Sequence, residues 1–242
     1  MAKQKTKSSF RTEFQLQPSS IQLDYGHRML SLGSCFSENI GQRLLSHKFD
    51  LITNPYGVLY NPKSIAQALS NLQKKHKISD KDLVEHNGLW QSFDFHSSFS
   101  GMDQNSCLQE MNKSVLKAGK QLEHADIVFI TFWTAFYYYL KDTKKTVANC
   151  HKFPATSFDR QRLSIQEIIS LFEPFIEDFV SSNSNIKFIF TVSPIRHLKD
   201  GCEENQLSKS ILRLAIDDIC KNHECAEYFP SYEILMDDLR DY

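Results

Sequence analysis

The apolar residues of this chain fall into short, almost wholly apolar runs separated by longer amphipathic segments. Such runs are typical of strands that are covered on both faces, as in a parallel sheet. They occupy residues 29–32, 126–132 and 185–192. Segments with helical spacing of apolar positions lie around and between them, at residues 40–49, 64–72, 107–122, 164–179 and 205–221. This alternation predicts an α/β domain of three α/β/α layers with a mainly parallel sheet.

Shorter segments carry local signals. Residues 89–96 alternate apolar and polar positions, which predicts a half-buried strand. Two Asn-Pro pairs and a glycine make residues 53–62 an ordered loop, and Ser64 is expected to cap the helix after it. The aromatic residues 133–139 are expected to form a turn that serves either as packing or as a pocket wall.

The first apolar run ends in Gly33-Ser34-Cys35, a tight turn between a strand and a helix. A nucleophile placed there stands at the carboxyl end of a strand, where open α/β sheets hold their ligands. The unpaired N–H groups of the helix start favour a thiolate and can hold an oxyanion. A purely structural explanation is also open, in which Ser34 or Ser37 caps the helix and Cys35 fills space.

A cysteine nucleophile needs a base and a group that orients the base. His197 and His151 are the candidates for the base, because each follows a predicted strand in a polar turn. Asp200 lies three residues after His197 and either orients an imidazole or caps the next turn. These residues equally suit solvent-exposed or hydrogen-bonding roles.

Substrate contacts are expected from the same turns. Asn149, Gly57 and the backbone near Cys35 are candidates to stabilise an oxyanion. Arg196 and Lys199 suit an anionic substrate or simply solvation. The sequence alone does not decide between a substrate-binding role and a purely solvated role for these two residues.

Composition limits the class of protein. The 242 residues suit one domain, which we place at residues 28–242 after an arm or edge segment at 1–27. Lys and Arg number 28 and Asp and Glu 29, so we expect neither a nucleic-acid nor a membrane partner. The basic start lacks the apolar stretch of a signal peptide, and a cytoplasmic location is expected.

The six cysteines contain no Cys-x-x-Cys pair, which predicts reduced thiols. Cys220, His223 and Cys225 lie close enough in sequence to suggest a metal corner, but a fourth ligand is not evident. We therefore expect no metal and no organic cofactor.

Five separated motifs resemble those of the GSCFA family, over roughly residues 28 to 242. The family takes its name from the motif that Gly33-Ser34-Cys35-Phe36 matches. The others are Asn54-Pro55-Tyr56-Gly57, Asn149-Cys150-His151-Lys152, Ser193-Pro194 with His197, and Tyr228-Phe229-Pro230 with Tyr232-Glu233. Members occur in bacteria, and many of these are Bacteroidetes.

That family is in turn similar to the SGNH, or GDSL-like, hydrolases, which are α/β/α, flavodoxin-like esterases with a Ser-His-Asp triad. Laying their first motif on this chain makes Cys35 the nucleophile and Ser34 the replacement of an aspartate, with Ser34 as the alternative nucleophile. The oxyanion segment corresponds to Trp133-Thr134-Ala135, which implicates Thr134. Trp133 replaces a glycine there and is expected to narrow the pocket.

The resemblance also implies an Asp-x-x-His-Pro segment shortly after a stretch matching Leu239-Arg240-Asp241-Tyr242, where this chain stops. Either the chain is truncated or its base lies elsewhere, for example at His197. The implied function is a hydrolase or acyltransferase that acts on an ester, such as that of an acylated saccharide, with a small-molecule or saccharide ester as its partner. The alternative is a catalytically degenerate carbohydrate-binding or scaffolding domain on the same fold. The oligomeric state stays open.

Overall fold

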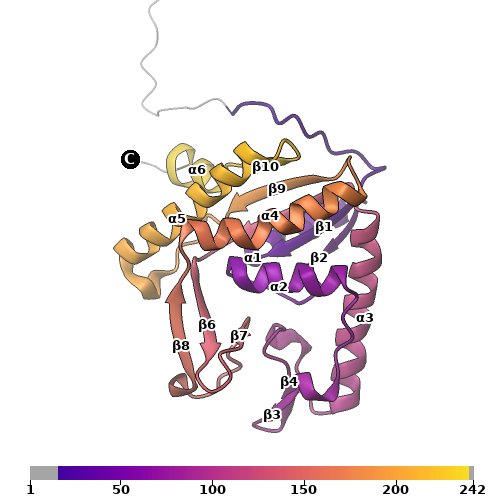
Figure 1. Cartoon of the computed structure of the whole chain (residues 1–242), viewed down its shortest axis with the longest axis vertical. Coiled ribbons are helices and arrows are strands. Elements are labelled where there is room, and N and C mark those ends of the chain that lie inside the picture. Colours follow the sequence, from indigo (N-terminus) through magenta and orange to yellow (C-terminus); the bar gives the residue numbers. More distant parts are fainter. Residues whose placement is uncertain (1–15, 240–242) are drawn as a thin grey trace, which may run out of the picture.

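The central sheet of the protein is parallel and has five strands in the order β10-β9-β5-β1-β2 (Figure 1). The computed structural model describes residues 16–239, so the arm expected at 1–27 lies partly outside the described residues. The strands are β1 (Arg28–Gly33), β2 (Asp50–Thr53), β5 (Ile127–Phe132), β9 (Lys187–Val192) and β10 (Ala226–Phe229).

Helices cover both faces of this sheet. On one face, α1 (Cys35–Ser46) packs through Leu44 and Leu45 on Met29 and Ile127. The helices of the other face are α2 (Pro62–Gln73), α3 (Gln104–Glu123), α4 (Ile165–Ser182) and α5 (Gly201–Asn222). The single turn α6 (Ser231–Glu233) follows β10 and leads into a π-helical turn at Ile234–Asp238. The predicted three-layer α/β/α class is therefore confirmed.

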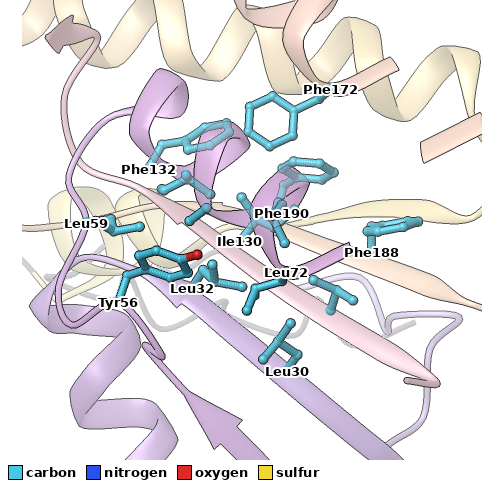
Figure 2. Close-up of a cluster of buried hydrophobic side chains, with 14 of the residues drawn as sticks. Leu30, Leu32, Tyr56, Leu59, Leu72, Ile130, Phe132, Phe172, Phe188 and Phe190 are labelled. Carbon is cyan, nitrogen blue, oxygen red and sulfur yellow. The ribbon is translucent and has the colours of Figure 1, made fainter. Parts of the chain in front are cut away.

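The main core lies between the sheet and the four helices of the second face. Figure 2 shows Leu30, Leu32 and Ile130 of the sheet meeting Leu72 of α2 and Phe172 of α4. All five side chains are fully buried, as alternation along the strands and helical spacing in α2 and α4 require. This packing fixes the strand ends on which the polar turns are built.

Two small antiparallel sheets extend from the main body, below it in Figure 1. They consist of β3 (Val84–His86) with β4 (Leu89–Gln91), and of β6 (Phe136–Leu140) with β7 (Thr146–Val147) and β8 (Phe158–Arg162). Short 3₁₀ turns lie at Asp80–Asp82, Ser97–Phe99, Ala155–Ser157 and Leu198–Asp200.

Several local predictions are wrong. The strand expected at 89–96 ends at Gln91, where the chain turns, and the turn expected at 133–139 contains strand β6. The helix after the Asn-Pro loop is capped by Asn61, whose side chain accepts the N–H of Ser64 at 2.9 Å. Ile40, the first apolar residue of the segment with helical spacing at 40–49, is 41% exposed. The pairing of β6 with β8 and the competing local cap at Asn61 decide two of these outcomes.

Candidate active site

The Gly33-Ser34-Cys35 turn lies at the carboxyl end of β1, as expected, and its two candidate nucleophiles have different environments. Ser34 is fully buried and is the N-cap of α1, since its Oγ accepts the N–H of Phe36 at 3.3 Å. Cys35 is exposed, at the first helical position. The structure thus presents the thiol to solvent and uses the hydroxyl in the helix cap.

Close backbone packing holds the turn in place. A Cβ atom added to Gly33 would lie 2.4 Å from the carbonyl oxygen of Thr131 on the neighbouring strand, at a φ of +151°. Asn54 anchors the same residue, because its Oδ1 accepts the N–H of Gly33 at 2.9 Å. Its Nδ2 donates to Glu38 at 2.9 Å, one helical turn after Cys35. The turn is therefore rigidly tied to the loop after β2.

Cys35 has an electrostatic partner that sequence reasoning missed. Lys209 of α5 is 2% exposed, and its Nζ donates to the carbonyl oxygens of Trp133 at 2.6 Å and Ser193 at 2.7 Å. Burial lowers the pKa of Lys209 to about 7, and the charge of a Cys35 thiolate opposes that change. Burial, and secondarily the Cys35 thiolate, raises the pKa of Tyr60. A buried lysine thus links the ends of β5 and β9 near the thiol.

His197 and Asp200 meet as the sequence spacing allows. His197 Nδ1 lies 2.7 Å from Asp200 Oδ2, and Arg160 of β8 contacts the other carboxylate oxygen at 2.5 Å. The Asp200 side chain is only 4% exposed. The indole of Trp133 packs edge-on against His197, with ring centroids 4.6 Å apart, and its other neighbour is Tyr60 at 4.8 Å. An aromatic layer therefore connects the histidine loop with the Cys35 neighbourhood.

His151 and Asn149 belong to a different cluster. The Nε2 atom of His151 lies 2.6 Å from the carbonyl oxygen of Ser92, and burial lowers the pKa of this imidazole. Asn149 accepts the backbone N–H of His151 at 2.9 Å and so stabilises its own loop. The ring of His151 packs near Phe93, in the small core beside β7 and β8. These contacts account for both residues without involving Cys35.

The remaining candidates have local hydrogen-bond roles. The N–H of Gly57 donates to the carbonyl oxygen of Asn54 at 2.7 Å, and that of Thr134 donates to Tyr60 at 3.1 Å. The hydroxyl of Thr134 accepts the N–H of Phe136 at 3.1 Å. Arg196 is exposed, and its guanidinium contacts the sulfur of Met236 at 3.3 Å.

His96 is a further imidazole that sequence reasoning missed. A Cβ added to Gly57 would lie 2.3 Å from the Cβ of His96, so the Asn-Pro loop packs directly on this residue. Its Nδ1 accepts the N–H of Ser98 at 3.2 Å. Burial lowers its pKa, and the carboxylate of Glu38 opposes that effect. The residue ends the segment read as a strand, which is why periodicity did not single it out.

Over residues 16–239, no cluster of three or more His, Cys, Asp or Glu side chains is arranged to hold a metal ion. Cys220, His223 and Cys225 accordingly form no metal centre there, and all six cysteines are free thiols. Within the same residues, no helix is both long and apolar enough to cross a membrane.

The family model described as the GSCFA family matches residues 28–242. The chain belongs to the GSCFA family. No curated protein and no solved structure matches it. The name-giving Gly-Ser-Cys-Phe motif of this GSCFA protein is thus the turn that begins α1, with the serine inside and the cysteine outside.

A large groove of this GSCFA protein begins beside that turn, since Phe36 and Ser37 line it. It has a volume of about 680 Å³ between α1 and the face of β5, β9 and β10, and residues 16–21 form part of its wall. Ile40, Phe129, Ile189 and Phe229 make most of the lining apolar. Within the described part of the chain, neither Ser34 nor Cys35 lines it.

Proposed function

We propose that this protein is a thiol-dependent acyl hydrolase or acyltransferase that acts on an ester, such as that of an acylated saccharide, with Cys35 as its nucleophile. The main support is the contrast at the turn, where Cys35 is exposed and Ser34 is sealed in the helix cap. The similarity of GSCFA proteins to the SGNH hydrolases agrees with this choice. Small-molecule esters are the proposed partners.

In the proposed reaction, the Cys35 thiolate attacks the acyl carbonyl carbon and forms a tetrahedral oxyanion. The C–O bond then breaks, the alcohol leaves with a proton, and the acyl group stays on sulfur as a thioester. Water completes hydrolysis by attacking that thioester, and a second alcohol instead completes acyl transfer. We assign the oxyanion to the N–H groups of Cys35 and Ser37 at the start of α1, since helix geometry provides them with no intrahelical acceptor, whereas the N–H of Phe36 is already bound by the Ser34 hydroxyl.

Two residues are proposed to handle the proton and the charge. His197 is the proposed base, since its Nδ1 faces Asp200 and its Nε2 is then the nitrogen that accepts a proton. Lys209 is proposed to stabilise the thiolate, because opposite charges that share a poorly solvated region attract strongly. His96 is the alternative base, beside Gly57 and Glu38.

The experiment compares two thiols of the same protein. Cys202 is also exposed and also lies in the first turn of a helix, so it shares the helix N-terminus effect with Cys35. Chloroacetamide labelling at pH 7, followed by peptide mass spectrometry, should modify Cys35 at least about tenfold faster than Cys202, because only Cys35 is proposed to be an activated nucleophile. Equal rates would contradict an activated nucleophile.

Activity itself is measured with a panel of aryl esters and acetylated sugars. Cys35→Ala should abolish turnover, and Cys202→Ala should leave it unchanged. Turnover that survives in Cys35→Ala and is lost in Ser34→Ala would transfer the role to the serine. A thioester on Cys35, trapped at low pH and detected by mass, is the direct evidence for the proposed intermediate.

One observation favours the second function, a catalytically degenerate binding domain. The N–H groups of Gly33, Gly57, Trp133 and Thr134 all donate to acceptors inside the protein, namely Asn54 Oδ1, the Asn54 carbonyl and the Tyr60 carbonyl. These four N–H groups are therefore already bound inside the protein and are not free to hold an oxyanion. Acetylated sugars that bind without turnover and without labelling of Cys35 would support this function instead.

A further inference from the structure

The apolar groove between α1 and β10 runs across the strands of the main sheet. Two rows of residues in register on β1, β5, β9 and β10 contribute to its lining. The first row is Ser31, Phe129, Ile189 and Glu227. The second row, nearer the carboxyl ends, contributes Thr131, Thr191 and Phe229, and its member on β1 is Gly33. Because Gly33 precedes the Ser34-Cys35 turn, one rim of the groove lies level with the candidate nucleophile.

Helix α1 continues the connection between the thiol and the groove. Phe36 and Ser37, the two residues that follow Cys35, both line it. Ile40 and Leu44 extend the same wall along the helix. The groove therefore begins beside the candidate site and leads away from it toward β10. A group attached to a carbonyl carbon at Cys35 can enter the groove from this end.

Much of the groove is apolar surface that the described residues leave uncovered. Ile40 is 41% exposed and Phe229 is 46% exposed. Phe129 and Ile189 are only half-buried, although they lie on inner strands of a parallel sheet, where both faces are normally covered. Contiguous exposed apolar surface of this kind marks a site for a ligand or a partner.

The polar groups of the wall are already engaged. Glu227 is the one charged residue of the lining within residues 16–239, and its carboxylate accepts the hydroxyl of Ser19 at 2.5 Å and the N–H of Ser20 at 3.2 Å. The hydroxyls of Ser31 and Ser37 lie 2.5 Å apart and pair with each other. A polar or charged ligand would have to displace these partners, whereas an aliphatic chain needs none of them.

We propose that this groove holds the aliphatic acyl chain of the ester substrate, so that the protein acts on esters of medium-chain acids. The proposal rests on the proposed function, because the acyl carbonyl must lie at Cys35. It commits to an acyl chain because the groove is continuous with the candidate site. Its volume of about 680 Å³ lies within the range of about 300–1,000 Å³ for small-molecule sites.

The length of the groove sets the expected length of the chain. From β1 to β10 there are three strand spacings of about 4.8 Å, or about 14 Å in all. An extended chain advances about 1.2 Å per bond, since the three backbone bonds of one residue span about 3.3–3.6 Å. The groove therefore matches an acyl chain of about ten to twelve carbon atoms.

The first experiment measures kcat/KM for p-nitrophenyl esters from butanoate to hexadecanoate, below their micelle concentrations. The value should rise at least about twofold per methylene up to about twelve carbons and then level off, because a fully buried methylene is worth about fourfold. Ile40→Glu, which places a charge in the groove, should remove this dependence on chain length. Leu116→Glu, at a 50% exposed leucine of α3 that does not line the groove, should keep it.

The second experiment measures binding without chemistry, with octan-1-ol and butan-1-ol as probes of Cys35→Ala by NMR. Octan-1-ol should bind about tenfold more tightly or better, and adding Ile40→Glu should remove that preference. If Ile40→Glu does not fold, Phe229→Glu replaces it in both experiments. Octan-1-ol that binds while no ester is turned over would refute the proposed reaction and support the groove as a site for aliphatic chains.

Three results would overturn the proposal. The first is ester turnover that does not depend on chain length, and the second is absence of octan-1-ol binding. The third is a dimer in sedimentation experiments that Ile40→Glu dissociates and Leu116→Glu does not, because the groove would then be covered by a second copy of the chain.

Discussion

The strand ends around Cys35 use polar groups in the opposite way to the wall of a cavity of about 400 Å³ beside α2, which Tyr56 and Ser64 help to line. At the strand ends, Asn54 binds Gly33 and Glu38, and Lys209 binds two backbone carbonyls. In the cavity, the hydroxyls of Tyr56 and Ser64 have no partner among the described residues. The difference teaches that the first region uses its polar groups to build a turn, and the second leaves two hydroxyl groups buried without a partner.

Two serines make this comparison quantitative. Ser37 and Ser64 are both the third residue of a helix, with exposures of 3% and 5%. The hydroxyl of Ser37 lies 2.5 Å from that of Ser31, whereas the hydroxyl of Ser64 is unpartnered. The same residue type at the same helical position therefore has a different energetic role in the two regions.

The largest expected effect tests how tightly the Cys35 turn is built. Gly33→Ala should lower the free energy of unfolding by about 3 kcal/mol or more, because its new methyl group would meet the Thr131 backbone at 2.4 Å. Gly88→Ala is the matched control, since Gly88 also has a positive φ, +73°, but has open space around it. We expect a loss of about 1 kcal/mol there. Equal losses in urea titrations would show that backbone conformation alone sets the cost.

The second prediction concerns the buried lysine and has a definite sign. Because burial lowers the pKa of Lys209 to about 7, the unfolded chain holds a proton above that pH that the folded chain has lost. Stability should therefore rise with pH above 7. Between pH 6.5 and 8.5, the unfolding free energy of the wild type should rise relative to Lys209→Met by about 1–2 kcal/mol.

Urea titrations at several pH values measure this difference. Lys117→Met, at an exposed lysine of α3, is the control and should follow the wild type at every pH. A difference between wild type and Lys209→Met that stays constant with pH would mean that Lys209 keeps its proton throughout.

The third prediction separates the helix cap from the nucleophile. Ser34→Ala should cost about 1 kcal/mol of unfolding free energy, because the N–H of Phe36 loses its acceptor. Cys35 should stay as reactive toward chloroacetamide in this variant as in the wild type. Loss of Cys35 labelling in a folded Ser34→Ala protein would instead show that the serine takes part in activating the thiol.

The smallest effect is expected from the serine pair. Ser37→Ala should cost about 1 kcal/mol, because Ser31 loses its partner in a buried site. Ser64→Ala should change the unfolding free energy by less than about 0.5 kcal/mol or stabilise the protein. Chemical denaturation of both variants in one buffer measures the contrast, and equal losses would remove the difference between the two regions.

The periodicity of apolar residues predicted the layers well, because the positions that a strand or helix buries follow from the spacing of apolar residues within that segment. The strands at 126–132 and 185–192 and the helix at 107–122 were confirmed with small changes of boundary. Strand β6 was missed, because its five residues pair with residues of β8 that lie 18 to 26 positions later. The cap at Asn61 was missed because Asn61 and Ser64, three positions apart, are both residue types that can cap a helix.

In the candidate site, too, features that depend on short sequence spacings could be predicted, and features that depend on tertiary packing could not. A strand-to-helix turn at Gly33-Ser34-Cys35 and the approach of Asp200 to His197 follow from short spacings, so local chemistry could predict them. Lys209 could not be found this way, since a lysine on an amphipathic helix is normally exposed. Only the packing of α5 against β9, and of its neighbours at the strand ends, buries this residue.

The sequence by itself determined the class of fold, the family and the turn that carries the thiol, because each depends on residues close together in the chain. The tertiary structure alone decided that Ser34 is covered and Cys35 is open, that His151 lies in another cluster, and that two hydroxyls near α2 are unsatisfied. Burial and hydrogen-bond partnership are properties of segments brought together from distant positions, and no local pattern records them.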